Sequence, residues 1–573
     1  MNNEEVEQAL SVITADFILS YNKGSDDNVW VFSLQGRKVW NVSLDFSLDF
    51  PHQLPLVKLL DKDDVGVLGH VNRSCTVCIE ESDSIVINIE EPSRVIEHFL
   101  KEIVETLDMS SLKINQVELT DEYEGYFQYD AKASVHSFYS ATDKLEKISL
   151  NIVPVKSGKL FQQNHLYNSP ILILDNSNTY PSEYSNVKKA ISTTVNIIHI
   201  PLQEAVLPPS NGKELTAEYI HVITEDISAK NKKVLEKFLR KTKEKKEFFL
   251  LISMPRTEAE RTQFLLHYTS AIDLHHPLKA YSDQWNIELF TIQRNNKEYL
   301  LERGGAQSSL LDKKVVLVGC GSVGGEIAYM LAKAGVGELT LIDPEGFEVD
   351  NIYRHRLGGD LLNYSPNDKG IVLPFSKAAA LKYSLQRDLP YLKVNAVEDY
   401  FEKVVDEEYI HSADLVIVAV GTPSINLKIN TMLKERNIKH VVFCWNEAAG
   451  YGGHAVYLDL EECCLECLHT DTGKFTNIGM LNFLEIGQHI SKNLTGCAGV
   501  FTPFSYLDSS QTAILAANQS VQVLLGNKLV SSASSWKGQG NSNLKTTQRY
   551  DDAALMSEVD IERVSSCKVC HGE

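Results

Sequence analysis

The amino-acid sequence predicts a multidomain protein that combines α/β and α+β domains. The chain has 573 residues, enough for about three domains of roughly 150–200 residues each. Residues 315–343 alternate strand, glycine-rich turn, helix and strand, which is typical of a nucleotide-binding βαβ unit. Residues 29–60 instead hold short β-like runs separated by turns, which favours an antiparallel sheet. We expect domains over residues 1–108, 109–295 and 296–573.

The bulk composition narrows the class of protein. Hydrophobic residues make up 43% of the chain, which is enough for several cores. The 76 acidic and 55 basic side chains give a net charge of −21, which argues against nucleic acid and anionic membranes as partners. The first residues, MNNEEVEQAL, do not resemble a signal peptide, and no apolar run reaches the roughly 20 residues of a membrane helix. We expect a cytoplasmic protein whose ten cysteines are metal ligands or nucleophiles rather than disulfides.

In chain order, the first domain is predicted to contain a helix, antiparallel strands, a loop and a second helix. The expected elements are a helix over 3–21, strands over 29–34, 39–44 and 56–60, and a helix over 92–107. The loop over residues 69–80 contains Cys75 and Cys78. A zinc site would require a second cysteine pair in this domain, and its sequence contains none.

This order of elements resembles a ubiquitin-conjugating enzyme. The resemblance rests on proline-containing turns, a short polar segment and a cysteine: Phe50-Pro51, Leu54-Pro55, His70-Val71-Asn72 and Val77-Cys78-Ile79. It implies that Cys78 is a catalytic nucleophile that carries an acyl group as a thioester. It also implies that Asn72 is a donor on the oxyanion side, although the interval from Asn72 to Cys78 is shorter than is usual in the family.

The middle segment carries no recognisable catalytic pattern. Expected elements are strands over 150–155, 170–174, 195–200 and 248–252, and a helix over 226–247. The basic run of this helix is interpreted as a solvent-exposed face. We expect a mixed α/β connecting domain.

The third domain is organised around the glycine-rich turn after the strand at 315–318. Gly319, Gly321 and Gly324 form a G-x-G-x-x-G pattern at the start of a helix, and Asp343 ends the next strand. Glycines let the backbone approach a phosphate, the helix N-terminus offers unpaired N–H groups, and the carboxylate can accept from a ribose hydroxyl. By itself the pattern fits NAD, FAD or ATP.

Three further polar residues narrow the choice of nucleotide. Asn351 and Arg354 follow the second strand at the carboxyl edge of the predicted sheet, where an amide and a guanidinium can contact a triphosphate. Lys377 stands in the first turn of a predicted helix, which is unfavourable for a cation and indicates a phosphate partner. With the glycine loop, this set resembles the adenylation domain of ubiquitin-activating enzymes and their bacterial sulfur-carrier-activating relatives.

That resemblance implies an ATP- and Mg²⁺-dependent activation of a protein carboxyl terminus as an acyl-adenylate. Asp343 would hold the ribose, and the three polar residues after it would hold the phosphates. Arg303, on the helix before the glycine loop, would reach across a homodimer. The family usually has an Asp that helps to hold Mg²⁺ after the strand at 413–420. Here that position is Gly421, so the Mg²⁺ ligand is unassigned.

Two C-x-x-C pairs predict a structural Zn²⁺ site, because four thiolates suit tetrahedral zinc. The expected ligands are Cys464, Cys467, Cys567 and Cys570. Cys463 and His571 are interpreted as neighbours of this set rather than ligands. The second pair with His571 also matches c-type haem attachment, which the missing export signal argues against.

Cys497 lies between the two pairs, in a loop of small residues before a helix predicted over 509–525. By resemblance, activating enzymes often carry their catalytic cysteine in this stretch. A thiol near a helix N-terminus can have a lowered pKa, which favours attack on an acyl-adenylate. The alternative is a buried structural cysteine. Cys320 and Cys444 are interpreted as packing residues.

The order of the domains resembles the fused activating–conjugating proteins of bacterial anti-phage CBASS operons. It implies transfer of a protein carboxyl terminus to Cys497, then to Cys78, then to an amine, in a homodimeric enzyme. Relatives of this kind attach a cGAS-like nucleotidyltransferase to a target. Two alternatives remain: a sulfur-carrier adenylyltransferase for cofactor biosynthesis, and a non-catalytic nucleotide-binding module with structural cysteines.

Overall fold

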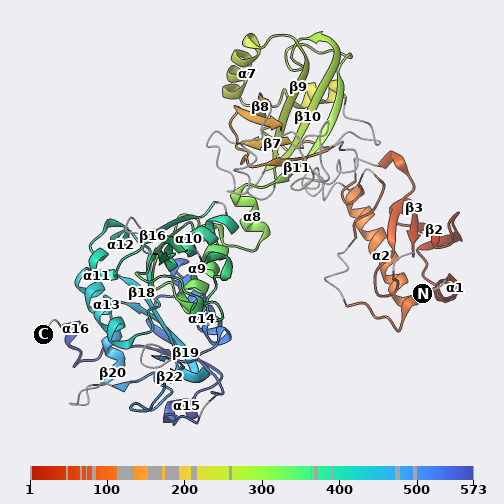
Figure 1. Ribbon diagram of the computed structural model, residues 1–573. Helices are drawn as coiled ribbons and strands as arrows, with labels where there is room; N and C mark the ends of the chain where they lie inside the picture. Colours follow the sequence, from red (N-terminus) through yellow and green to blue (C-terminus); the bar gives the residue numbers. More distant parts are fainter. Residues whose placement is uncertain are drawn as a thin grey trace. The chain divides into compact units, whose positions relative to one another are not determined.

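The structure is a computed structural model that forms two compact units, divided between Asn296 and Lys297 (Figure 1). It describes residues 3–46, 49–64, 68–72, 74–79, 86–112, 131, 133–152, 171–174, 193–207, 216–256, 261–362, 364–366, 372–389, 391–470, 478–494, 500–541 and 543–571. The first unit contains a small antiparallel sheet and a closed barrel, and the second contains one large sheet.

The N-terminal part is an antiparallel sheet, with strands in sequence order, against which a long helix packs. Its elements are α1 (Asn3–Ser11), β1 (Ile18–Lys23), β2 (Val29–Gln35), β3 (Val39–Asp45), β4 (Leu56–Leu59) and α2 (Pro92–Ser111). Alternate residues of β2 and β3 are buried, because successive side chains of a strand face opposite sides. The apolar side of α2, which includes Ile96, Leu100 and Ile103, joins the same core.

The predicted helix over residues 3–21 is wrong at its carboxyl end. α1 ends at Ser11, and β1 pairs antiparallel with β2. Tyr21 on β1 contacts the rings of Trp30 and Phe32. Pairing and aromatic packing in a sheet therefore outweigh the helical spacing of the apolar residues. The predicted strands β2, β3 and β4 and the second helix are confirmed.

The middle part is a closed barrel, and its described residues also form two helices. Its elements are β5 (Ala133–Ser137), β6 (Glu146–Ile152), β7 (Ile171–Leu174), β8 (Thr193–Pro201), α6 (Ala217–Ile223), α7 (Ala229–Lys241), β9 (Lys245–Pro255), β10 (Arg261–Leu274) and β11 (Asn286–Arg294), in the barrel order β10-β11-β5-β7-β6-β8-β9. The helix predicted over 226–247 ends earlier, at Lys241. Its last predicted residues belong to β9, whose pairing with β10 outweighs helix propensity.

The C-terminal part is a sheet in the order β16-β13-β12-β17-β18-β19-β24-β25. Its larger elements are α8 (Lys297–Arg303), β12 (Lys314–Val318), α9 (Ser322–Ala334), β13 (Glu338–Ile342), α10 (Lys377–Asp388), β16 (Lys393–Val397), β17 (Leu415–Val418), α13 (Pro423–Glu435), β18 (His440–Asn446), β19 (Gly452–Asp459), α14 (Tyr506–Leu524), β24 (Ser532–Lys537) and β25 (Met556–Asp560). Its short elements are β14 (Tyr364–Pro366), β15 (Val372–Pro374), α11 (Phe401–Val404), α12 (Glu408–His411), β20 (His469–Thr470), β21 (Ile478–Gly479), β22 (Lys492–Asn493), β23 (Val500–Phe501), α15 (Gln548–Asp552) and α16 (Lys568–His571).

Helices cover both faces of this sheet, as the continuous apolar run of β12 predicts. Val315 and Leu317 pack in one core with α9, α10 and α14, whereas Val316 and Val318 pack in a second core with α11 to α13. β12 lies between β13 and β17, and all three run parallel. The strand order reverses at β12, so a ligand is expected beyond the carboxyl ends of these strands.

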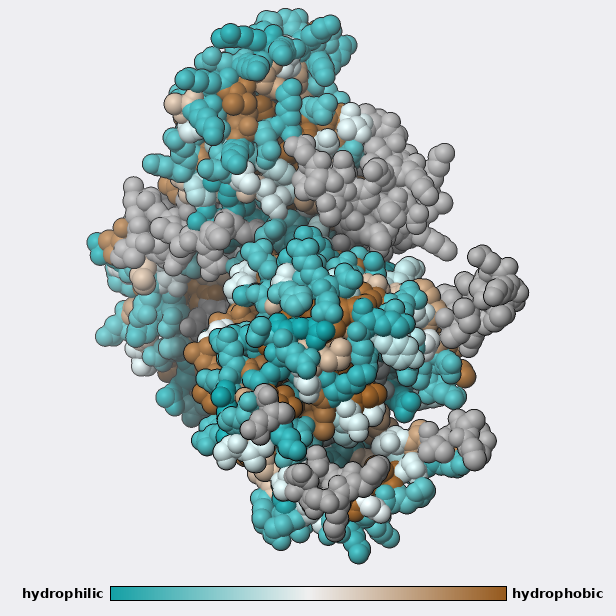
Figure 2. Space-filling view, turned by 90° about the vertical axis from the view of Figure 1, so that its left-hand side faces the viewer, coloured by the Kyte–Doolittle hydropathy of each residue, from teal (hydrophilic) through white to brown (hydrophobic). Residues whose placement is uncertain are grey.

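The surface that faces the viewer in Figure 2 is mostly hydrophilic, with apolar patches between the hydrophilic residues. Among the described helices, none is both long and apolar enough to cross a membrane.

Candidate functional site

The glycine loop between β12 and α9 has the shape of a phosphate cradle. Gly319 has a φ of +92°, and a Cβ there would stand 2.8 Å from the carbonyl oxygen of Ala419. A Cβ at Gly324 would stand 1.9 Å from the carbonyl oxygen of Gly319, so both positions require glycine. Gly321 differs, because a Cβ there would meet no atom within 4 Å. The open side of the loop lies at the N-terminus of α9, where backbone N–H groups lack helical partners. These residues fit a nucleotide phosphate.

Asp343, at the end of β13, is hydrogen-bonded to the backbone of this loop. Its carboxylate is buried and accepts the backbone N–H of Cys320 at 2.7 Å and that of Glu345 at 2.8 Å. Burial raises the pKa of Asp343, and these two N–H donors oppose the rise. The carboxylate therefore fixes the loop, and its role as a ribose acceptor stays a prediction.

Sequence reasoning missed His355, which holds the other side of the loop. Its Nδ1 accepts the backbone N–H of Leu357 at 3.1 Å, so Nε2 carries the proton and donates to the carbonyl oxygen of Cys320 at 2.6 Å. Burial lowers the pKa of His355 to about 4, so the ring is neutral at pH 7. In the sequence, only its position next to Arg354 indicated His355. That position did not distinguish a buried residue that holds the loop from a surface residue.

Asn351 and Arg354 lie in the segment that leaves β13. The side-chain oxygen of Asn351 accepts the backbone N–H of Glu348 at 3.0 Å and closes a short 3₁₀ turn. The guanidinium of Arg354 lies 5.6 Å from the centre of the Phe504 ring, as a cation–π contact. Both side chains are half-buried at the predicted ligand edge. Their contact with phosphates stays a prediction.

Lys377, the first residue of α10, has an anionic partner within the protein. Its Nζ lies 2.5 Å from Oε2 of Glu345, and its side chain is only 10% exposed, compared with 69% for Glu345. The sequence indicated a phosphate as the partner of this lysine and did not identify Glu345. A bound phosphate and the Glu345 carboxylate would compete for the same ammonium group.

The structure supplies no ligand for Mg²⁺ at residue 421. Gly421 has a φ of +74° and faces open space. Among the described residues, the side chains that lie close enough together to hold a metal ion are cysteines. They lie elsewhere in the domain. No described residue is therefore a candidate ligand for Mg²⁺ at this position.

The four predicted zinc ligands come together, as expected from the two C-x-x-C pairs. The Sγ atoms of Cys464, Cys467, Cys567 and Cys570 all lie within 4.8 Å of one another. Separations of 3.5, 3.6 and 4.0 Å bracket the roughly 3.8 Å expected between thiolates around a tetrahedral Zn²⁺. A hydrogen bond between the Cys464 and Cys467 sulfur atoms lowers the pKa of the Cys467 thiol. The donor set fits Zn²⁺.

The neighbouring residues Cys463 and His571 stand outside this set, as predicted. The Sγ of Cys463 donates to the carbonyl oxygen of Ile561 at 3.8 Å. Cys320 and Cys444 are fully buried packing residues, and burial raises the pKa of Cys444 to about 12.

Cys78 lies in an exposed, irregular loop of the N-terminal part. Its backbone N–H donates to the carbonyl oxygen of His70 at 2.7 Å, and its side chain faces solvent. His70 and Cys75 have φ values of +62° and +66°. The side-chain oxygen of Asn72 accepts from Ser74 and from the backbone of Thr76, so Asn72 holds the loop in shape. Its predicted role as a donor to an oxyanion stays a prediction.

A groove of about 480 Å³ opens beside this loop, between Ile79 and α2. Val95 and Phe99 contribute apolar side chains to its lining, and Arg94 and His98 contribute polar ones. The exposed thiol therefore stands next to a surface with room for an extended peptide.

Cys497 lies outside the described residues. In the sequence it stands between β22 and β23, which pair with each other. The helix that follows, α14, begins at Tyr506 rather than at the predicted residue 509, because Ser505 and Asp508 form a capping box.

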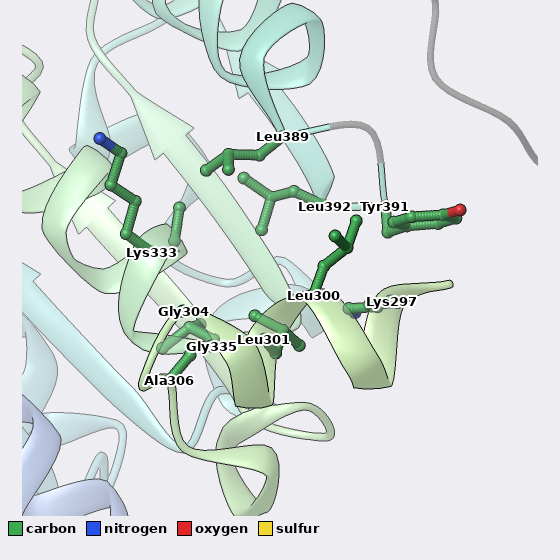
Figure 3. Close-up of a pocket in the computed structure, with 12 residues that line it drawn as sticks. Lys297, Leu300, Leu301, Gly304, Ala306, Lys333, Gly335, Leu389, Tyr391 and Leu392 are labelled. Carbon is green, nitrogen blue, oxygen red and sulfur yellow. The ribbon is translucent and has the colours of Figure 1, made fainter. Parts of the chain in front are cut away.

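Arg303 is the exposed last residue of α8, and the structure does not test its predicted reach across a dimer. A pocket of about 280 Å³ lies beside this helix. Leu300, Leu389 and Leu392 contribute apolar side chains to its lining (Figure 3). Gly335 at the carboxyl end of α9 also lines it, so this pocket lies at the opposite end of α9 from the glycine loop.

Two protein families match separate parts of the chain. Residues 292–561 match the ThiF family, and residues 11–135 match prokaryotic E2 family B. The first match includes the glycine loop, Cys464 and Cys467, whereas Cys567 and Cys570 lie beyond its end. The second includes Cys78 and extends beyond residue 108.

Several known proteins are similar to parts of the chain. The ATP-dependent ubiquitin transferase-like protein Cap2 of Vibrio cholerae is 25% identical over 242 residues, which are 40% of this chain and 39% of that protein. The adenylyltransferase and sulfurtransferase MOCS3 of Dictyostelium discoideum is 26% identical over 155 residues, which are 27% of this chain and 34% of that protein. A crystal structure of E. coli MccB with ATP aligns at 18% identity and a TM-score of 0.32, and the alignment covers 48% of this chain and 75% of MccB. The chain thus spans about two fifths or less of the length of these curated relatives.

Proposed function

We propose that this protein uses ATP to activate a protein carboxyl terminus and then conjugates that carboxyl group to an amine. The chain joins a region that matches the ThiF family to a region that matches prokaryotic E2 family B. The carboxylate attacks the α-phosphate of ATP, an acyl-adenylate forms and pyrophosphate leaves. The Cys497 thiolate then attacks the acyl carbon, and AMP leaves. Exchange of the thioester to Cys78 frees Cys497, and attack by an amine forms an amide and frees Cys78.

One observation carries this proposal. A glycine loop that is open at Gly321, with Lys377 and Arg354 at the same sheet edge, occurs in one chain with an exposed Cys78. The first set suits binding and positioning of ATP, since backbone N–H groups and two cations meet the charge of phosphates. The exposed thiol suits transfer, because an acyl group attached to a protein requires an accessible nucleophile.

Each residue has a defined task in this scheme. Asp343 takes the ribose, and Asn351, Arg354 and Lys377 take the phosphates. Zn²⁺ on Cys464, Cys467, Cys567 and Cys570 holds the C-terminal segment to the sheet. Mg²⁺, when bound, neutralises phosphate charge. Arg303 completes the site of a partner subunit in a homodimer.

The proposed acyl donor is a cGAS-like nucleotidyltransferase, which conjugation to a target would prime for anti-phage signalling. The resemblance of the domain order to activating–conjugating proteins of CBASS operons supports this choice. The similarity to the ATP-dependent ubiquitin transferase-like protein Cap2 of Vibrio cholerae supports the conjugating activity itself.

A sulfur-carrier adenylyltransferase is the second candidate, and the similarity to MOCS3 favours it. It would use the same adenylation chemistry. It would have no use for Cys78 or for the groove beside it, which is the reason to rank it second.

Carrier-dependent exchange of ATP and pyrophosphate tests the proposal. The protein is mixed with labelled pyrophosphate and ATP, together with a cGAS-like nucleotidyltransferase, the same protein without its last residues, or a bacterial sulfur carrier. Exchange only with the intact nucleotidyltransferase supports the conjugating enzyme. Exchange only with the sulfur carrier selects the second candidate, and ATP binding without exchange in any mixture indicates a binding module.

A further inference from the structure

The segment formed by α7 and the start of β9 carries a local excess of positive charge. Residues 229–247 hold nine basic and three acidic side chains. Their net charge of +6, set against −21 for the whole chain, leaves −27 for the other residues. All nine basic residues are exposed. An acidic chain therefore presents a basic surface at this place.

Helical spacing brings four of these lysines to one side of α7. Lys230, Lys233, Lys237 and Lys241 follow one another at intervals of three or four residues, so they share a face of the helix. Val234 lies among them by the same spacing, and it is 43% exposed although it is apolar. We call these five residues the lysine face.

Contacts on the other side of α7 fix this helix to the barrel (Figure 1). The side-chain amide of Asn231 donates to the carbonyl oxygen of Asp143 at 2.9 Å, and its oxygen accepts the backbone N–H of Leu145 at 3.1 Å. The Oγ of Ser228 accepts the backbone N–H of Asn231 and caps the helix, and Leu239 is buried. The lysine face is therefore a pre-formed surface, so a partner would bind it without having to order the helix.

The four lysines of this face have no anionic partner among the described residues. The ion pair described within α7 joins Arg240 to Glu236, and neither belongs to the lysine face. Like charges at this spacing destabilise a helix, and Lys230 in the first turn also opposes the helix dipole. Glu–Lys pairs would keep the helix soluble without these effects, and a net charge of −21 already favours solubility. The uninterrupted lysines therefore indicate an anionic partner.

The composition of the lysine face favours an acidic protein segment as this partner. Its ammonium groups surround the exposed Val234, and the lysine stems add apolar surface. Carboxylates together with an apolar side chain match both features. The helix has 13 residues and is about 20 Å long, which is the span of roughly six extended residues. A short segment can occupy it, whereas a long nucleic acid would also meet the acidic remainder of the chain.

We propose that the lysine face of α7 docks an acidic segment of a partner protein, in which carboxylates alternate with apolar side chains. The carboxylates pair with the lysines, and an apolar side chain covers Val234. Docking at this surface forms and breaks no covalent bond. It goes beyond the proposed function and does not require the proposed chemistry.

Fluorescence anisotropy with the full-length protein tests this inference. The probe is a labelled peptide of about eight residues, in which glutamates alternate with leucines. It is compared with the same peptide carrying serines in place of leucines, with an oligodeoxythymidylate, and with vesicles that contain phosphatidylserine. The glutamate–leucine peptide is expected to bind most tightly, and its affinity should fall as salt is added. A photoreactive leucine analogue in this peptide should crosslink to residues 230–241, as located by mass spectrometry.

Charge reversal on the lysine face is expected to weaken binding. Lys233→Glu together with Lys237→Glu should raise the Kd of the peptide by about tenfold or more. Lys233→Gln with Lys237→Gln should raise it less, and Val234→Ser by about threefold. The matched control is Lys62→Glu with Lys492→Glu, which reverses two exposed lysines outside the barrel. It changes the net charge equally and should keep the wild-type Kd.

A wild-type Kd in both double variants of Lys233 and Lys237 would overturn the proposal. Equal weakening in the control would also overturn it, because net charge rather than the lysine face would then explain the binding. Tighter binding of the oligonucleotide or the vesicles would replace the acidic segment by another class of partner. Circular dichroism verifies folding, and if the charge-reversed variant unfolds, the Gln variant decides. Pyrophosphate exchange is measured separately, so its failure would not affect this result.

Discussion

The N-terminal part and the C-terminal part present their reactive groups in opposite ways. In the C-terminal part, Asp343 and His355 are buried and hydrogen-bonded to the glycine loop, and Lys377 is nearly buried against Glu345. In the N-terminal part, Cys78 is exposed on a loop that is held by backbone contacts and by Asn72. A site that orders a small charged ligand needs pre-formed, desolvated groups, whereas a site that accepts an acyl group from another protein surface needs access.

Loss of the metal site is expected to have the largest effect on stability, and to affect the C-terminal part rather than the N-terminal part. Structural zinc contributes on the order of 10 kcal/mol to folding. Cys464→Ser should remove bound zinc and unfold the C-terminal part in a thermal scan. Cys463→Ser, the adjacent control, should keep the metal and cost about 1 kcal/mol. Zinc measured by plasma mass spectrometry checks both, and equal metal loss in the two variants contradicts the assignment.

Two alanine substitutions in the glycine loop are expected to distinguish the close backbone packing of the loop from its contact with phosphate. Gly324→Ala places a Cβ against the carbonyl oxygen of Gly319 and should cost about 1–3 kcal/mol of unfolding free energy, with loss of ATP binding. Gly321→Ala should leave stability unchanged and still weaken ATP binding, because its Cβ enters the space expected for phosphate. Denaturant unfolding and calorimetric titration measure the two effects. Wild-type affinity in Gly321→Ala would show that no phosphate approaches the loop.

Substitutions in the Lys377–Glu345 pair test whether the Lys377 ammonium group binds a phosphate of ATP. Lys377→Met should raise the Kd for ATP about tenfold, because a charge-assisted contact is lost. Glu345→Gln removes the competing carboxylate and should lower the Kd. Titration at two salt concentrations checks the electrostatic origin. If Glu345→Gln weakens binding instead, Glu345 is itself part of the nucleotide site.

The pH dependence of stability tests whether the buried His355 ring is neutral. Its pKa is about 4 in the folded protein and near 6.5 in the unfolded chain, so the unfolded state binds more protons between these values. The stabilisation by neutral His355 is therefore complete above pH 6.5 and is lost as pH falls towards 4, by on the order of 3 kcal/mol. His355→Gln should show a flatter pH dependence of the unfolding free energy. Identical pH profiles would contradict the buried, neutral ring.

The features of the fold that could be predicted are those whose sequence pattern lies within one short segment. The apolar run of β12, the glycine loop and the C-x-x-C pairs each carry their own signal, and the structure confirms the strand, the helix after it and the cysteine set. The β-like runs over 29–34 and 39–44 likewise predicted strands, and the structure has β2 and β3 there.

The remaining features depend on contacts between segments that are distant in sequence. β1 was misread as helix because its pairing with β2 decides its conformation. The closed barrel depends on strands such as β5 and β11, which are far apart in sequence and pair in parallel. Glu345 and His355 were missed because a lone polar residue shows its role only through its partner.

Thioester formation tests the central claim most directly. The protein is incubated with ATP and a cGAS-like nucleotidyltransferase, and adducts are separated on a non-reducing gel. We expect an adduct that a reductant removes, and we expect Cys78→Ala to trap it on Cys497 while carrier-dependent pyrophosphate exchange continues. Exchange without a thioester on either Cys497 or Cys78 would contradict the account.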